Sequence, residues 1–200
     1  MLLRRFLSTA VVAGCVCLAN FAQAALVTNG GFETGNFTGW TYVPAPDSPY
    51  ILFWTAASGQ QVAPHGGTYA LGFGAIGSTE DAIYQSLATT PGDGYTLTFW
   101  LKNEFGNLGP NSFRAFIDST LLLENVVALG SDYVEFTFDF FATSTQTTLK
   151  FSGRNYSSWT MLDDVSVEAN GRHTQVPEPG TLALLGFGLA GLAFARRRKQ

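Results

Sequence analysis

The sequence predicts an all-β fold, a sandwich of two sheets, for the middle of this 200-residue chain. Residues 95–102 and 134–140 alternate apolar and polar side chains, which is the period of a strand with one face in the core. Turn residues separate the apolar runs, and the chain contains 22 Gly, 8 Pro and 14% aromatic residues. The sequence has no helical periodicity of useful length, which excludes a coiled coil or a large helical bundle.

Residues 1–24 have the pattern of a signal peptide. Two arginines precede the apolar run 6–18, and Ala22-Gln23-Ala24 is the small-x-small pattern that signal peptidase cleaves, so we expect the mature chain to begin at Ala25. The alternatives are a permanent membrane anchor, for which the run is short, and a lipoprotein acylated at Cys15. Both cysteines lie in this segment, so we expect no disulfide and no cysteine-bound metal in the mature chain.

Residues 25–168 contain eight apolar runs with the character of strands. These runs are residues 50–55, 69–73, 82–87, 95–102, 113–117, 134–140, 147–151 and 161–167. Strands with one apolar face bury that face by pairing two sheets, and a jelly-roll sandwich is the simplest such fold for this number of strands. We expect the polar residues 169–175 to form a tether after the domain.

The last segment, residues 176–200, combines a proline motif, an apolar run and a basic cap. The motif is Val176, Pro177, Glu178 and Pro179, and the cap is Arg196, Arg197, Arg198 and Lys199. The run 181–195 predicts a short transmembrane helix, since it rises only about 21 Å against a hydrocarbon core of roughly 30 Å. The basic cap would hold the C-terminus in the cytoplasm.

This segment resembles the PEP-CTERM sorting signal of Gram-negative bacteria that secrete exopolysaccharide. The resemblance implies a transient anchor in the inner membrane and processing by an exosortase at the Pro-Glu-Pro motif. It also implies transfer of the protein to the cell surface or the extracellular matrix. A plain C-terminal membrane anchor is the alternative, and it would explain the apolar run and the arginines but not residues 176–179.

The two ends of the domain resemble carbohydrate-binding modules with a galactose-binding-like jelly roll. The likeness rests on Asn-Gly-Gly-Phe-Glu at 29–33 followed by Gly-Trp at 39–40, and on Leu-Asp-Asp-Val-Ser-Val at 162–167. It implies that these segments form the first and last strands of the sandwich. The motifs are weak for any particular ligand, because related folds serve as lectins, enzyme accessories and structural modules.

Asp163 is predicted to point into the sandwich, because it shares its parity with Val165 and Val167. A buried carboxylate needs a cation, a metal or hydrogen bonds. Glu33 is the obvious companion, and oxygen ligands of this kind suit Ca²⁺. In the resembled modules a structural calcium is held by residues that correspond to Glu33, the carbonyl of Gly31 and Asp163. Hydrogen bonding without a metal is the alternative.

The domain is strongly acidic. Between residues 25 and 170 four basic residues face fourteen acidic ones, a net charge of −10. This charge excludes nucleic acid as a partner and favours a neutral or weakly cationic glycan over a polyanion.

Catalytic motifs are absent from the sequence, and we predict that the protein is not an enzyme. It has no Gly-x-Ser-x-Gly and no His-Glu-x-x-His motif, and His65 lies in a turn where a surface role is expected. The acidic pairs 80–81 and 163–164 point to opposite faces of a strand and cannot flank one glycosidic bond. A glycosidase built from distant acids, such as Glu104 with Glu135, is the alternative.

Aromatic residues are the best indication of a ligand. Trp100 has the outward parity of its strand, where a flat apolar ring can stack on a sugar. The further candidates for ligand binding are Trp54, Trp159 and Tyr156. We therefore predict a glycan-binding module whose partner is exopolysaccharide, and the alternative is a structural protein of the cell surface or biofilm matrix that binds no small ligand.

Overall fold

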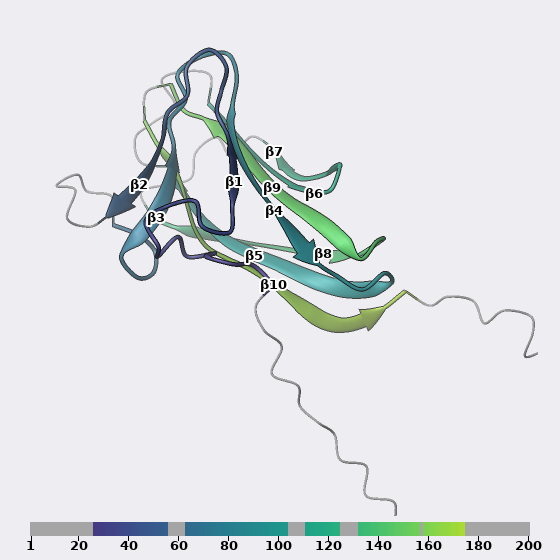
Figure 1. The fold of residues 1–200 in the computed structure, drawn as a ribbon. Coiled ribbons are helices and arrows are strands. Elements are labelled where there is room, and N and C mark those ends of the chain that lie inside the picture. Colours follow the sequence, from purple (N-terminus) through teal and green to yellow (C-terminus); the bar gives the residue numbers. More distant parts are fainter. Residues whose placement is uncertain (1–25, 56–62, 104–110, 125–131, 157, 175–200) are drawn as a thin grey trace, which may run out of the picture.

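The computed structural model describes residues 26–55, 63–103, 111–124, 132–156 and 158–174, which fold into a sandwich of two five-stranded antiparallel sheets (Figure 1). One sheet has the strand order β1-β4-β9-β6-β7 and the other has the order β2-β3-β10-β5-β8. The strands are β1 (Thr41–Val43), β2 (Ile51–Thr55), β3 (Tyr69–Phe73), β4 (Asp81–Ala88), β5 (Asp93–Asn103), β6 (Ser112–Ile117), β7 (Thr120–Glu124), β8 (Val134–Phe141), β9 (Gln146–Arg154) and β10 (Thr160–His173). The predicted all-β sandwich is confirmed.

Alternation of side chains builds the core between the sheets. Leu97, Phe99 and Leu101 of β5 are fully buried, while the intervening side chains face outward. The ring of Phe99 lies 5.1 Å from that of Phe151 in the opposite sheet, in an edge-to-face arrangement. Trp40, which precedes β1, is also part of this core. Apolar burial between the sheets therefore fixes the inward parity of each strand.

All eight predicted runs are strands, and the sequence analysis missed two edge strands, β1 and β7. The segment 29–40, expected to contain the first strand, forms turns and bends instead, and the first strand begins only at Thr41. The expected tether is corrected by the structure, because β10 continues to His173. Arg172 forms an ion pair with Asp139 of β8, and the His173 ring contacts Asp93 of β5. These contacts give the polar residues 169–173 partners along β5 and β8, so they extend the strand.

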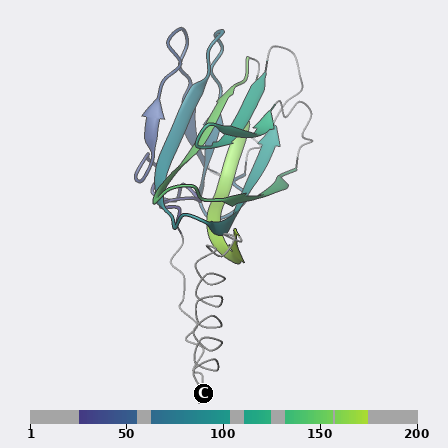
Figure 2. The ribbon, with the colours of Figure 1, turned by 90° about the vertical axis from the view of Figure 1, so that its right-hand side faces the viewer.

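The long strand β10 runs from one end of the sandwich to the other, and the two ends are called the far end and the tail end. It runs for 14 residues, which corresponds to a length of about 40 Å. The tail end comprises the residues around 88–93, 141–146 and 168–174, and the far end comprises the connections 44–50, 74–80 and 154–159. In Figure 2 the yellow end of β10 lies at the bottom of the sandwich, at the tail end.

The predicted leader 1–24 and sorting segment 176–200, with the expected membrane helix 181–195, lie outside the described residues. In the part of the chain that the structure describes, no helix has the length and hydropathy needed to cross a membrane.

Candidate functional site

An aromatic pocket of about 230 Å³ opens at the far end. Three of its side chains project well into solvent, with exposed fractions of 57% for Tyr156, 50% for Ile76 and 49% for Tyr50. The pocket is lined by Tyr50, Gly74, Ile76, Asn155, Tyr156, Ser158 and Trp159. Apolar side chains that remain exposed at a concave site are typical of a ligand-binding surface.

Trp159 is the fixed wall of the aromatic pocket. Its ring lies against the end of β3, where a side-chain carbon would come within 3.0 Å of the ring at Gly72 and within 2.6 Å at Gly74, just after the strand. Trp54 packs against it edge-on at 5.0 Å, and Tyr50 lies 4.7 Å away on the pocket side. Glycine at position 74 therefore allows the indole to lie close to the backbone, and its neighbours hold it in one orientation.

Asn155 places an unpartnered acceptor at the aromatic pocket. Its backbone N–H donates to the carbonyl of Ala75, and its Nδ2 donates to Oδ1 of Asn103 at 3.0 Å. The side chain is fully buried, yet its Oδ1 has no hydrogen-bond partner. Buried polar atoms are nearly always paired, so an acceptor of this kind in a pocket points to a donor on a ligand or a bound water.

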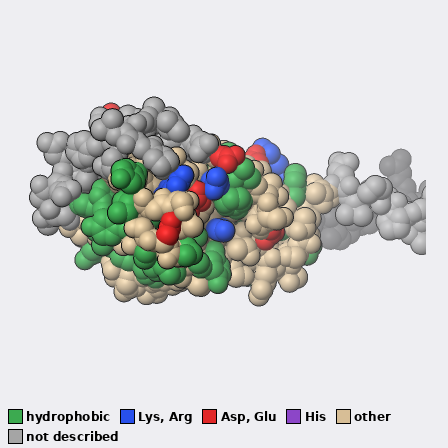
Figure 3. Space-filling model, turned by 90° about the horizontal axis from the view of Figure 1, so that it is seen from above, with side chains coloured by type: hydrophobic (Ala, Val, Ile, Leu, Met, Phe, Trp, Pro, Cys, Tyr) green, Lys and Arg blue, Asp and Glu red, His purple; other side chains and the backbone are tan. Residues whose placement is uncertain are grey.

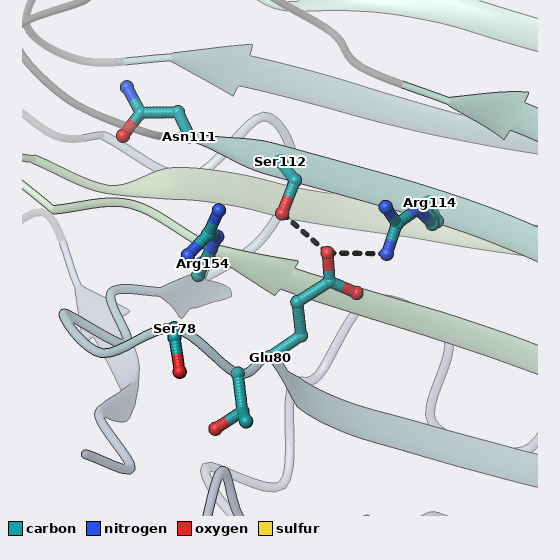
Figure 4. A pocket seen from close by; sticks show the side chains of 7 residues that line it. Ser78, Glu80, Asn111, Ser112, Arg114 and Arg154 are labelled. Carbon is teal, nitrogen blue, oxygen red and sulfur yellow. Dashed lines mark hydrogen bonds and ion pairs between the residues drawn. The ribbon is translucent and has the colours of Figure 1, made fainter. Parts of the chain in front are cut away.

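A second, larger hollow of about 540 Å³ adjoins the far end, and we call it the arginine pocket (Figure 4). It is lined by Ser78, Thr79, Glu80, Asn111, Ser112, Arg114 and Arg154. Seen from above, basic and acidic side chains gather near the middle of the visible face, beside apolar ones (Figure 3). The arginine pocket is therefore polar where the aromatic pocket is apolar.

Glu80 and Arg114 form the charged floor of the arginine pocket. Arg114 donates to Glu80 at 2.8 Å and to Glu124 at 3.1 Å. Burial alone would raise the pKa of Glu80, but hydrogen bonds from Ser112 and Ser152 and the charge of Arg114 outweigh it, and the pKa is lowered. Glu80 is thus ionised at neutral pH, and two glutamates balance the charge of Arg114.

Trp100 faces outward as expected, but a neighbouring ring covers it. The imidazole of His65 stacks on the indole with ring centroids 3.9 Å apart, and His65 Nδ1 lies 2.6 Å from a carboxylate oxygen of Asp164. His65 is therefore more than the surface turn residue that the sequence indicated. Trp100 does not line the aromatic pocket, and its role in ligand binding stays a prediction.

Glu33 and Asp163 both hold the loop at residues 65–69. Asp163 is fully buried, but the parity prediction was wrong: it pairs with the outward-facing Trp100, and a register shift between Asp163 and Ser166 comes before the inward-facing Val165. The loop at His65 covers it, and its Oδ2 accepts the backbone N–H of His65 at 2.8 Å. Glu33 accepts the N–H groups of Thr68 and Tyr69. Burial raises the pKa of Asp163 to about 7, although hydrogen bonds from backbone N–H groups oppose the shift.

The donors at this place fit calcium in kind. Gly31 lies beside the acids of β10, because a side-chain carbon there would be 3.3 Å from Oδ1 of Asp164 and 4.0 Å from Oδ1 of Asp163. Among the described residues no three His, Cys, Asp or Glu side chains are grouped to hold a metal, so backbone carbonyls would have to complete the shell. The observed hydrogen bonds are those of the metal-free alternative.

The sorting signal and the fold are both supported by comparison with known proteins. Residues 175–199 match the family described as the PEP-CTERM protein-sorting motif, which confirms the interpretation of the C-terminal segment and marks the chain as one that is exported and sorted at the membrane. No curated protein matches the chain in sequence.

Among solved structures, the chain is similar to TmCBM61 in complex with β-1,4-galactotriose, with 18% identity and a TM-score of 0.59 over 74% of this chain and 100% of that one. It is also similar to the CBM22-1–GH10 modules of Clostridium thermocellum endo-1,4-β-D-xylanase 10B complexed with xylohexaose, with 21% identity and a TM-score of 0.51 over 72% of this chain and 28% of that one. A third structure is the enzymatically active domain of bacteriophage CBA120 tailspike protein 4, with 15% identity and a TM-score of 0.53 over 72% and 21% of the two chains.

These likenesses show that the domain has the jelly-roll fold of carbohydrate-binding modules. Because the fold also occurs in an enzymatically active domain, function has to be argued from the site. Of the distant acids considered for catalysis, Glu104 lies outside the described residues. Glu80 and Asp81 do point apart, since Asp81 is buried against Tyr42 while Glu80 lines the arginine pocket. For Asp163 and Asp164 the expectation was wrong, because both carboxylates contact His65 where the strand is irregular.

Proposed function

We propose that the protein is an exported glycan-binding module that takes a sugar ring in the aromatic pocket. The observation that carries this proposal is the unpartnered Oδ1 of Asn155 beneath exposed aromatic side chains. A sugar ring offers an apolar face to stack on Tyr156 or Trp159 and hydroxyl groups that can donate to Asn155.

The position of the pocket supports display on a surface. The sorting motif begins at residue 175, directly after the last described residue of the tail end, and the aromatic pocket lies at the opposite end of β10. A protein attached through its C-terminal segment would present the pocket away from the membrane. The similar structures with bound galactotriose and xylohexaose favour an oligosaccharide as the class of ligand. Exosortase and exopolysaccharide remain the proposed partners.

Calcium is proposed as a structural ion held by Glu33 and Asp163, with the carbonyl of Gly31 as a third ligand. Its support is a fully buried acid whose pKa is raised by burial and by the neighbouring charge of Asp164, while Glu33 binds the same loop three residues farther on. A divalent cation would supply the positive charge that this group of acids lacks.

Retention on immobilised neutral and acidic polysaccharides tests the proposed function. Tyr156→Ala removes the most exposed aromatic side chain of the pocket, and we expect roughly a tenfold loss of affinity from the lost stacking. Phe141→Ala is the matched control, because Phe141 is 45% exposed but lies at the tail end. Failure of the wild type to bind any polysaccharide, or equal losses in both variants, would favour the structural role instead.

A further inference from the structure

The arginine pocket contains two hydrogen-bond donors that the protein leaves unused. Arg154 donates from Nη1 to the carbonyl of Gly77 at 3.0 Å, and among the described residues no carboxylate lies within ion-pair distance of its guanidinium. Nδ2 of Asn111 is buried and has no partner. Oδ1 of Asn111 accepts the N–H of Tyr156 at 3.0 Å, which fixes the orientation of the amide.

The acceptors of the same pocket are already occupied. One carboxylate oxygen of Glu80 accepts from Ser112 and Arg114, and the other accepts from Ser152 at 2.7 Å. In Figure 4 the Arg154 side chain lies between Asn111 and Ser78, apart from the Glu80–Arg114 pair. Arg154 therefore lacks a carboxylate partner and Nδ2 of Asn111 lacks an acceptor, and a ligand that supplies an acceptor with a negative charge would complete both.

We propose that the arginine pocket binds the carboxylate of a uronic acid residue in the glycan, with Arg154 and Asn111 as the donors. This inference rests on the proposed function, because it names the kind of sugar next to the aromatic pocket. A carboxylate only accepts hydrogen bonds, and the planar guanidinium can give it two parallel ones. A neutral hydroxymethyl group would bring neither the charge nor the second acceptor.

The two pockets share one segment of chain. Arg154 lines the arginine pocket, Asn155 and Tyr156 line the aromatic pocket, and the N–H of Tyr156 is bonded to Asn111. An oligosaccharide that crosses residues 154–156 would place one ring on the aromatic side and a neighbouring carboxylate on the arginine side. Recognition would then need two adjacent sugar units.

The acidic net charge limits how many carboxylates the ligand can carry. Two of the four basic residues between 25 and 170, Arg114 and Arg154, line this pocket. Glu80 and Glu124 balance Arg114, so Arg154 supplies the positive charge for a ligand, while the domain as a whole is at −10. At physiological salt charges beyond about 8 Å are largely screened. The fitting ligand is therefore a largely neutral polymer with isolated uronic acid residues, which refines the expectation of a neutral glycan.

Trisaccharides that carry a single glucuronic, galacturonic or mannuronic acid residue among neutral sugars, each as free acid and as methyl ester, test the proposal by calorimetric titration into the purified protein. The ester has nearly the same shape but no charge. We expect at least one free acid to bind about tenfold more tightly than its ester. Arg154→Gln should abolish this preference, because it weakens the binding of the free acid more than the binding of the ester.

Two further variants separate the site from general effects. Asn111→Asp keeps the acceptor for Tyr156 but turns the unused donor into an anion, so it should also abolish the preference. Arg172→Gln removes the same charge at the tail end and should preserve it. Thermal unfolding of each variant checks that the fold is intact.

If the wild-type protein binds every free acid and its ester with equal affinity, the uronic acid site is overturned. The proposed glycan-binding function still stands in that case, because the sugars are bound. Loss of the preference in Arg172→Gln to the same extent as in Arg154→Gln also overturns the uronic acid site, because net charge would then explain the effect. Absence of binding to these probes and to the whole polysaccharide panel overturns both proposals together.

Discussion

The two ends of the sandwich differ in how completely their polar groups are paired. At the tail end charged side chains are paired, as in the contacts of Arg172 with Asp139 and of His173 with Asp93. At the far end Nδ2 of Asn111 and Oδ1 of Asn155 are buried without partners, and Tyr156 projects into solvent. Since folding normally satisfies buried polar atoms, this difference is the reason for proposing the far end, and not the tail end, as the ligand-binding end.

Replacing Asp81 should cause the largest loss of stability, and it tests whether the far end is held in place by this buried carboxylate. The carboxylate accepts the Tyr42 hydroxyl and the N–H groups of Ala45 and Tyr50, and so holds the connection 44–50 at the far end. Asp81→Ala would leave three donors unpaired, and we expect a loss of about 5 kcal/mol in the free energy of unfolding. Urea denaturation measures it. A loss too small to detect would mean that the far end is not held by this carboxylate.

Asp163 should make stability fall as pH rises. Burial raises its pKa to about 7, while the unfolded value is about 3.9, so the folded state binds more protons between these values. This contribution is present at low pH and is lost as pH rises through 7, by about 4 kcal/mol at most. Asp164 and His65 lie beside it. Urea unfolding between pH 5 and 8 in chelator should show a slope that Asp163→Asn removes, and identical slopes would contradict this.

Calcium should oppose this slope, if Glu33 and Asp163 bind it. Binding to the folded state alone adds about 2.7 kcal/mol at a hundredfold excess over the dissociation constant. We expect a higher melting temperature with calcium than with chelator at pH 8, and no such rise in Glu33→Gln. An unchanged melting temperature and no metal in the purified protein would leave the hydrogen-bonded arrangement as the correct one.

The Arg172–Asp139 pair at the tail end should give the smallest effect. Both side chains are largely exposed, with exposed fractions of 61% and 42%, and surface ion pairs contribute little. Asp139→Asn should therefore leave both thermal stability and polysaccharide retention close to the wild type. A marked loss of retention would move the binding site toward the tail end.

The alternation of apolar and polar residues along the sequence predicted most of the strands. Strands with a face in the core, such as β5 and β8, show alternation because burial imposes it. The edge strands β1 and β7 were missed, since β1 has only three residues and the Leu-Leu-Leu run in β7 shows no alternation. The extension of β10 to His173 was missed because its polar residues are held by partners distant in sequence.

The site was predicted only in part. Trp159 and Tyr156 were named as ligand contacts and the structure places both in the aromatic pocket, but Trp100 is covered by a loop histidine that strand parity cannot reveal. The sequence analysis did not predict that Asn111 and Arg154 line one pocket, because they are far apart in sequence and only the pairing of β6 with β9 brings them together. A signal was available in the scarcity of basic residues, since Arg154, one of only four between residues 25 and 170, lies next to Asn155 and Tyr156.

Mapping a bound glycan onto the two ends tests the central claim most directly. Proton–nitrogen NMR spectra would be recorded with and without the oligosaccharide that the panel identifies. The account predicts that shifts concentrate at the Asn155 side-chain amide, the Trp159 indole and the backbone of Tyr156, while Asp93, Asp139 and Arg172 stay unchanged. Shifts confined to the tail end, or to the Trp100 and His65 rings, would contradict the assignment of the far end as the binding site.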